Sequence, residues 1–334
     1  MEKQSGTLAD RPCMIAAGEM LTSGLSMGFL HTGNRLHRMR RVLHTHLQPK
    51  AAEEYQPLQM THAKKGVLSI LDDPHNFRNH TETYAATTSM KIAYGKDKIT
   101  FATDPDSSDR EAHQSNDRLL KVMRPGSYLV DTISWLKYIP WYGQELKRGF
   151  QSTSRRLHMR QLNHVRQHIS NIDVGLSFAK HVLENGHSYG ITEIEAAFLA
   201  GAFFQLDPPL YQTSMAICTV LMAAACFPEE QAKVLAELDA VIGRHRGSSI
   251  PFLQLGSIIS PMETVVCQWS VSSWQTRPGQ VISQQYDLRM IIRHQGDYCI
   301  PAGTTVSGNH WAISRDLDVF PEPHAFKPWR WIDD

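Results

Sequence analysis

The sequence predicts a mainly helical protein with a small β portion, and three observations support this fold class. The stretch from Thr192 to Gly243 is largely apolar between charged ends, as expected of a long central helix buried on most sides. Apolar residues recur at helical spacing in several other segments. The segment Tyr298–Val306 has short apolar runs on either side of a Pro-Ala-Gly turn, which indicates two strands. A chain of 334 residues can bury a substantial core around such a helix.

The central helix has a clear starting signal. Thr192 is followed three residues later by Glu195, the spacing of a capping box, so a helix is expected to begin there. The run Met215 to Phe227, apolar except for Thr219, is short for a membrane span and typical of a buried core helix. The simplest alternative is a core helix of any large α protein, which by itself would assign no function.

Prolines divide this stretch into separate helices. Pro208 and Pro209 each remove a helical N–H and clash with the preceding turn, at a cost of about 3 kcal/mol inside a helix. We therefore expect the first half to end near Leu206 and the second half to begin near Leu210. Pro228 is followed by two acidic residues and starts a further helix, because proline and negative charge both suit a first turn.

The segment 34–47 is the first strong helix of the chain. Its apolar side chains form one stripe, made of Leu36, Met39, Leu43 and Leu47. Arg40 lies at the edge of this stripe, and an arginine held against an apolar surface needs an anionic partner. A basic face left in solvent is the alternative. A nucleic-acid-binding helix is a weaker one, because no aromatic platform lies beside it and the chain has no basic excess elsewhere.

Composition excludes several classes of function. The net charge of +1 provides no general field for nucleic acid or an anionic membrane. The 17 histidines show no metal-ligand spacing, so most are expected at the surface. The cysteines are odd in number, form no CxxC pair and indicate reduced intracellular thiols: Cys13, Cys218, Cys226, Cys267 and Cys299.

Other segments carry weaker signals. Two helices are expected in 53–94, interrupted at an Asp-Asp-Pro sequence, and one long helix in 144–184. The aromatic segment 131–143 is expected to pack under a loop. Neither 1–33 nor 248–294 has a sustained period, so no element is predicted there.

Several motifs resemble one family. IPAGTTVSGNHWAISRDLDVFPEPHAFKPWRWIDD resembles the segment that leads to the haem loop in microsomal-type, especially fungal, cytochromes P450. GNRLHRMRRVLH resembles the C helix, and WLKYIPWYGQELKRGF resembles the start of the F–G region. EAAFLAGAFF and AICTVLMAAACFPEEQAKVLAELDAVIG resemble the I helix and the J helix after it. The matches cover roughly three quarters of the chain in the family's order, which is far more specific than a single motif.

The resemblance implies a partial cytochrome P450 fold, a single incomplete domain over 1–334 built around an I helix that is broken at Pro208–Pro209. Its regions would be the C helix at 34–47, the F–G region at 128–185, the I helix at 192–227, the J helix at 228–243, a divergent helix K region at 248–294, and the β and PxRW segment at 298–334.

The resemblance also implies a function. Members are haem-dependent monooxygenases, oxidoreductases that place one oxygen atom from O2 into a substrate and hold the haem iron through one cysteine thiolate. A lipophilic small molecule would lie against Met20–Leu30 and Phe198–Phe204. NADPH would act indirectly through a reductase docked near Arg35, Arg38 and Arg41, although a solvated charged surface is an equal alternative. The implied location is the endoplasmic reticulum membrane. Without the family's N-terminal anchor, this chain is expected to be intracellular and either soluble or peripheral.

Site residues are carried over by matching positions. Arg40 matches the arginine that binds a haem propionate, and Leu36 stands where the family usually has tryptophan, so one hydrogen bond to the propionate is lost. The PxRW-type motif comprises Pro328, Arg330 and Trp331. Asp207 and Thr213 are the residues nearest to the acid and alcohol pair of the I helix.

Three departures from the family's pattern bear on activity. The haem-cysteine loop would lie after Asp334, no ExxR occurs in the helix K region, and two prolines separate Asp207 from Thr213. For the polypeptide as written, we therefore expect no thiolate-ligated haem, no metal ligand and no turnover. Either the chain belongs to an active monooxygenase whose gene was read incompletely or misassembled, or it is a non-catalytic remnant. Ligation by Cys299, Cys267 or a histidine is a further alternative, but Cys299 is expected to be a small core residue.

Overall fold

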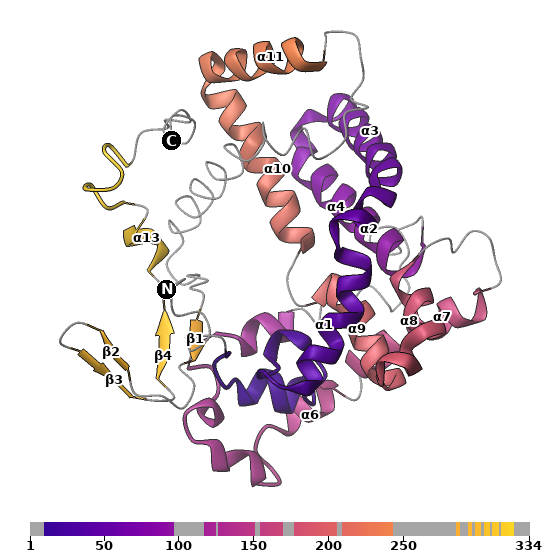
Figure 1. Cartoon of the computed structure of the whole chain (residues 1–334), viewed down its shortest axis with the longest axis vertical. Helices are drawn as coiled ribbons and strands as arrows, with labels where there is room; N and C mark the ends of the chain where they lie inside the picture. The colour runs from indigo at the N-terminus through magenta and orange to yellow at the C-terminus, as the bar shows by residue number, and fades with distance from the viewer. Residues whose placement is uncertain are drawn as a thin grey trace. The chain divides into compact units, whose positions relative to one another are not determined.

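The structure of the protein is a computed structural model, and it is mainly helical, as predicted (Figure 1). The residues that it describes are 10–96, 117–124, 126–150, 154–169, 177–205, 209–242, 285–287, 293–295, 298–301, 304–307, 309–313 and 315–323.

The α-helices among these residues are α1 (Asn34–Leu47), α2 (Pro49–Glu54), α3 (Gln56–Asp72), α4 (Phe77–Tyr94), α6 (Gln144–Gly149), α7 (Arg155–Gln167), α8 (Phe178–Asn185), α9 (Glu193–Gln205), α10 (Pro209–Cys226), α11 (Pro228–Ile242) and α13 (His310–Ile313). Shorter helical turns include η2 (Ile15–Leu21), η3 (Met27–Phe29), η5 (Leu129–Asp131), η6 (Ser134–Tyr138) and η9 (Gly186–Tyr189).

Four short strands form two pairs. β2 (Arg293–Gln295) runs antiparallel to β3 (Tyr298–Ile300), with His294 opposite Cys299. β1 (Gln285–Asp287) pairs with β4 (Thr305–Ser307). The two strands predicted around the Pro-Ala-Gly turn are present as β3 and β4, but each pairs with an earlier strand that the sequence did not predict.

The chain divides into two compact units. The first comprises Met1–Ala63, Thr83–Leu210 and Gln285–Val306, and the second comprises Lys64–Glu82, Tyr211–Gln284 and Ser307–Asp334. This grouping does not test the prediction of a single domain, which stays a prediction.

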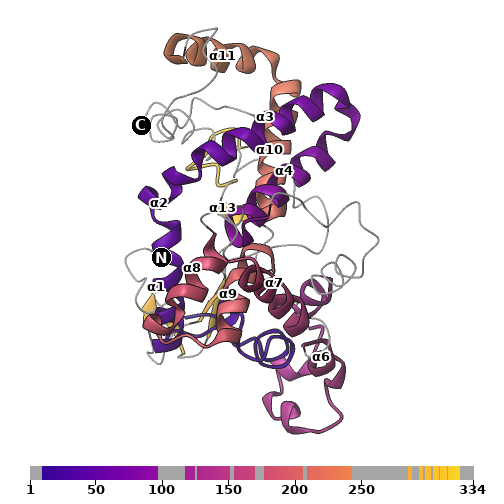
Figure 2. The same cartoon turned by 90° about the vertical axis from the view of Figure 1, so that its right-hand side faces the viewer.

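The first unit contains two hydrophobic cores. The larger one joins buried faces of α1, α4, α7, α8 and α9, and α9 packs directly against both α7 and α8 (Figures 1 and 2). Its largest fully buried side chains are Met39, Leu162, Phe178 and Leu199. The smaller core joins η2, helical residues 117–122, η5 and α6. In both cores the burial of apolar area is the main stabilising contribution.

The second unit contains α10 and α11, and Figure 1 shows α11 turning sharply away from the end of α10. Pro228 occupies the first position of α11, as predicted, and Glu229 and Glu230 follow in its first turn. Cys218 is buried on α10, where its Sγ lies 3.2 Å from Thr81 Oγ1. Among the described residues, no helix is both long enough and apolar enough to cross a membrane.

Local predictions agree well with the structure. The segment 34–47 forms α1 over the predicted range. The capping box is present, because Thr192 N and Oγ1 both donate to Glu195 Oε2 at 2.9 Å, and Glu195 N donates to Thr192 Oγ1 at 3.4 Å. The central helix is also broken as predicted, since α9 ends at Gln205 and α10 begins at Pro209.

Several predictions about longer segments are wrong. Residues 144–184 contain three helices, α6 to α8, instead of one, and Ser177 caps the last of them by accepting a hydrogen bond from Lys180 N. Leu47, predicted in the apolar stripe, is 55% exposed because it lies in the last turn of α1. Residues 1–33, for which no element was predicted, contain η2, whose side chains are mostly buried in the smaller core.

The aromatic segment 131–143 also differs from its prediction. It was expected to pack under a loop, but Trp135, Tyr138 and Trp141 are all more than 60% exposed. Only Leu136 and Tyr142 of this segment are partly buried against the smaller core. Trp135 and Tyr138 are three residues apart in the 3-10 turn η6, and its three-residue period places both on the same exposed side.

We expect Glu195→Gln to lower the free energy of unfolding and to make it depend less on pH in the acid range. Burial raises the pKa of Glu195, but hydrogen bonds from Thr192 and the charge of Arg35 together lower it below 4.5. A carboxyl with a lowered folded-state pKa adds stability above its unfolded pKa, and this stability is lost as pH falls through the folded value. Glu195→Gln should therefore cost about 1–2 kcal/mol at neutral pH and flatten the stability profile below about pH 4.5. Urea unfolding at several pH values measures both effects.

The matched control is Glu82→Gln. Glu82 forms an exposed i, i+4 pair with Arg78, so its loss should change the free energy of unfolding by less than about 0.5 kcal/mol. An unchanged acid profile in Glu195→Gln would contradict the role assigned to this carboxylate.

Candidate functional site

Arg40 projects from the solvent-facing side of α1. The opposite side of this helix is buried in the core through Leu36, Met39 and Val42. Arg40 itself is exposed and, within the described parts of the chain, forms no ion pair with a carboxylate. The predicted anionic partner is therefore not a side chain of the described residues, and the position stays open to an anionic ligand.

Leu36 is 3% exposed and has no polar atom in its side chain. It therefore contributes packing and cannot donate a hydrogen bond, which is consistent with the predicted loss of one donor at this position.

Arg11 lies within electrostatic range of Arg40, and sequence reasoning missed it. The Arg11 side chain is half-buried, and its Nη1 donates a hydrogen bond to the carbonyl oxygen of Met27. Burial lowers the pKa of Arg11, and the positive charge of Arg40 lowers it further, while Asp10 opposes both effects. The only sequence signal was a lone arginine before Pro12, 29 positions away from Arg40, and no local spacing connects the two.

Two guanidinium groups held near each other call for negative charge between them. Like charges repel, and burying one of them increases the cost because solvent screens it less. In the described part of the chain, neither Arg11 nor Arg40 has a carboxylate ion-pair partner. An arginine pair of this kind suits a ligand that carries carboxylate or phosphate groups, which guanidinium binds through parallel hydrogen bonds.

One ion pair and several hydrogen bonds hold α1 against the start of α9. Arg35 Nε donates to Glu195 Oε1 at 2.7 Å, and Glu195 Oε2 also accepts hydrogen bonds from Thr192 N and Oγ1. The Glu195 side chain is 8% exposed, so the pair is shielded on its acidic side. Arg35 is thus engaged within the chain and does not present a free charge to a partner.

The first half of the central helix faces an aromatic cluster. The Phe198 ring lies 4.4 Å from the His158 ring and 5.9 Å from the Phe150 ring, measured between centroids. Further along α9, Phe203 lies 5.2 Å from Phe178. Of the residues predicted to line a substrate pocket, Met27, Leu30 and Phe203 pack against the larger core. The structure therefore brings parts of the two predicted segments together on one apolar surface.

Gly201 allows α7 to approach α9 closely. A Cβ atom at this position would collide with ring atoms of His158, which is buried on α7. Only glycine fits at this position, because the contact with His158 leaves no room for a methyl group.

Several predicted site residues cannot be compared with the structure. Asp207 and the motif residues Pro328, Arg330 and Trp331 lie outside the described residues. Thr213 is described: it is an exposed residue of α10, in the second compact unit.

The cysteines show no built metal centre. Cys13 and Cys226 are exposed, and Cys218 is buried beside Thr81. The side chains of Cys267 and Cys299 lie outside the described residues, although the backbone of Cys299 is in β3. Over the described ranges, no group of three or more His, Cys, Asp or Glu side chains could hold a metal ion.

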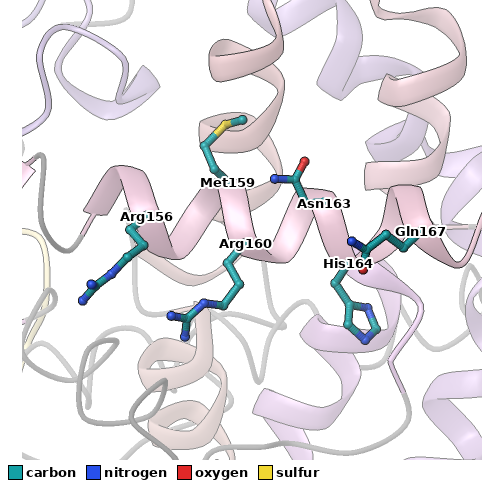
Figure 3. A pocket seen from close by; sticks show the side chains of 6 residues that line it. All are labelled: Arg156, Met159, Arg160, Asn163, His164 and Gln167. Atoms are coloured by element: carbon teal, nitrogen blue, oxygen red, sulfur yellow. The ribbon is translucent and has the colours of Figure 1, made fainter.

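A shallow open groove of about 430 Å³ runs over the exposed side of α7. Figure 3 shows Arg156, Arg160 and His164 pointing to one side of the helix and Met159 and Asn163 to the other. Its lining comes from one helix and includes none of the residues carried over by resemblance: Arg156, Met159, Arg160, Asn163, His164 and Gln167. We therefore assign it no role in the candidate site.

Comparison with known proteins identifies the family. The cytochrome P450 family model matches residues 292–334. Cytochrome P450 monooxygenase 113 of Postia placenta is 37% identical over 332 residues, which cover 99% of this chain and 64% of that protein. The chain belongs to the cytochrome P450 family. A cytochrome P450 monooxygenase of Armillaria gallica is more distant, at 26% identity over 100% of this chain and 62% of its own length.

Solved structures agree on the fold. A zebrafish cytochrome P450 solved with progesterone has a TM-score of 0.69 at 19% identity, covering 99% of this chain and 75% of that one. A second structure, with abiraterone, has a TM-score of 0.65 at 18% identity, covering 99% of this chain and 73% of that one. This cytochrome P450 chain thus has part of the family's fold, as predicted. It spans 64% of the length of curated relatives such as monooxygenases 113 and 88 of Postia placenta.

In this cytochrome P450 chain we expect Gly201→Ala to be destabilising. The added methyl group would force His158 or the α7–α9 spacing to move, at a cost of about 1–3 kcal/mol. Thermal unfolding would measure the loss. Gly186→Ala is the matched control, because its added Cβ would meet only Val182 at an ordinary 3.7 Å. A double variant with His158→Ala should be no less stable than His158→Ala alone, and an additive loss would show that the collision is not the cause.

Proposed function

We propose that the chain forms part of a haem-dependent monooxygenase that places one oxygen atom from O2 into a lipophilic small molecule. The observation that carries the proposal is the Arg11–Arg40 pair, which offers two cationic groups to a ligand with two carboxylates. Haem has two propionate groups, so the residues present fit this end of the cofactor. The curated relatives, named as cytochrome P450 monooxygenases, support the same activity.

In this proposal each group has a separate task. Arg40 and Arg11 would bind the propionates, while Leu36 packs beneath them without a hydrogen bond. When bound, haem supplies the oxidation chemistry, and the protein supplies orientation and a shaped apolar environment. The apolar surface around Met27, Leu30 and Phe203 would exclude water and bind a lipophilic substrate.

The redox partner is proposed to be an NADPH-dependent reductase that docks on the basic face of α1. Arg38 and Arg41 are exposed and have no ion-pair partner within the described ranges. Arg35 is less available because it is held by Glu195. The resemblance to microsomal-type members supports a location at the endoplasmic reticulum membrane, which fractionation of the source cells would test.

A second candidate is a non-catalytic cytochrome P450 remnant. The separate helices α9, which ends at Gln205, and α10, which begins at Pro209, favour it, and in the sequence two prolines stand between the nearest acid, Asp207, and the nearest alcohol, Thr213. A proton pathway of the family type needs these groups at fixed spacing on a single helix.

The absorption spectrum distinguishes the two candidates. The purified chain would be supplied with haem, reduced, and exposed to carbon monoxide. A thiolate-type Soret shift would support the monooxygenase, and its loss in Cys299→Ser would identify the ligand. Haem uptake without that shift supports a cofactor-binding remnant, and absence of any uptake refutes haem binding by this polypeptide.

We expect Arg40→Ala to weaken haem uptake about 10-fold or more, because a hydrogen bond to a charged group contributes about 1.5–3 kcal/mol. Titration of the Soret absorbance measures the dissociation constant. Arg38→Ala is the matched control, since it removes the same charge from another face of α1. Equal weakening by both variants would mean that overall charge, and not a propionate contact, explains the effect.

The reductase proposal predicts a salt-dependent defect. Arg41→Glu should weaken reductase binding about 3- to 10-fold at low ionic strength and much less at high ionic strength, because exposed charges are screened by salt. Binding of the chain to surface-immobilised reductase, followed at low and at high ionic strength, would measure the affinity. Lys65→Glu, an exposed reversal on α3, should have no comparable effect. A defect that persists at high salt would argue against electrostatic docking.

A further inference from the structure

We propose that Asp10 is the positioning residue of the arginine pair. Its carboxylate fastens the segment that carries Arg11 to the start of the helix that carries Arg40. This inference rests on the proposed function of the pair as a holder of haem carboxylates.

The contacts of Asp10 connect two distant parts of the chain. Its Oδ1 accepts hydrogen bonds from Thr32 N at 2.8 Å, from Thr32 Oγ1 at 3.2 Å and from Arg11 N at 3.0 Å. His31 Nδ1 lies 3.4 Å from the same oxygen. A single carboxylate oxygen thus gathers donors from residues 11, 31 and 32, and charge-assisted bonds of this kind are stronger than neutral ones.

These contacts fix both arginines. Arg11 is held at its backbone N–H by Asp10 and at its guanidinium by the carbonyl of Met27. Thr32 precedes Gly33, the N-cap of α1, and Gly33 has no side chain with which to cap the helix. Holding Thr32 therefore sets where α1 begins, and Arg40 lies less than two turns further along this helix.

The electrostatics support this arrangement. Burial raises the pKa of Asp10, but the hydrogen bonds from Thr32 and Arg11 and the nearby His31 together lower it below 3.8. The carboxylate is therefore charged at neutral pH, and its negative charge lies near the positive end of α1. Without Asp10, repulsion between Arg11 and Arg40 would act on a segment with one fewer attachment.

The chain offers a close comparison in Asp131. Its Oδ1 accepts a hydrogen bond from Ala16 N at 2.9 Å, so it also holds the opening segment through a backbone N–H. Within the described ranges, Asp131 forms no hydrogen bond or ion pair with Arg11, Thr32 or α1. Asp10→Asn and Asp131→Asn therefore both remove a carboxylate that anchors this segment, but only Asp10 connects it to the arginine pair.

The test compares binding of haem and of its dimethyl ester by the full chain. The ester keeps the ring and the iron but lacks both carboxylates, so the ratio of the two dissociation constants reports contacts to the propionates. We expect wild type to prefer free haem, and Arg11→Ala to abolish most of that preference. Asp10→Asn should reduce the ratio about 5- to 10-fold, and Asp131→Asn should leave it unchanged.

The possible outcomes separate the positioning role of Asp10 from the proposed haem site. A ratio unchanged in Asp10→Asn but reduced in Arg11→Ala overturns the positioning role while leaving the proposed function intact. Equal loss of affinity for both ligands in Asp10→Asn means a general structural role and also overturns it. Wild type without any preference refutes the cofactor site itself. If Asp10→Asn fails to fold by circular dichroism, Thr32→Val, which removes the 3.2 Å contact and keeps the backbone N–H bond to Asp10, must still lower the ratio.

Discussion

The contact of Arg35 with Glu195 determines how the first unit is assembled. One buried carboxylate accepts hydrogen bonds from the start of its own helix and from a side chain of α1, which lies 160 residues earlier in the sequence. Because the same group caps α9 and holds α1, the two helices cannot be ordered independently. Both helices also contribute buried side chains to the larger core, and α1 carries Arg40.

A second constraint is the repulsion between Arg11 and Arg40. In the described part of the chain no carboxylate forms an ion pair with either arginine, and the charge of Asp10 offsets only part of the repulsion at Arg11. Hydrogen bonds to Asp10 and to the Met27 carbonyl hold Arg11 in place. Binding sites often contain such charge that folding alone would not favour. In a cytochrome P450 chain this is physically consistent with a cofactor whose two carboxylates would relieve the repulsion.

Sequence reasoning succeeded where the determining interactions are local. The bounds of α1, the Thr192–Glu195 capping box and the break before Pro209 all follow from spacing within a few residues. It failed where burial depends on distant neighbours, as for Trp135 and for the mostly buried residues of η2. Arg11 was missed for the same reason, because its importance comes from a neighbour 29 positions away.

The break between α9 and α10 alters the polarity of the most apolar part of the chain. An uninterrupted helix would satisfy every backbone group along its length, whereas two helices have two additional ends. The last carbonyl groups of α9 have no donors within their own helix, and the first N–H groups of α10 have no acceptors within theirs. Each end also carries a partial charge of opposite sign. The double proline thus adds two polar helix ends to the middle of a sequence that otherwise consists almost entirely of apolar residues.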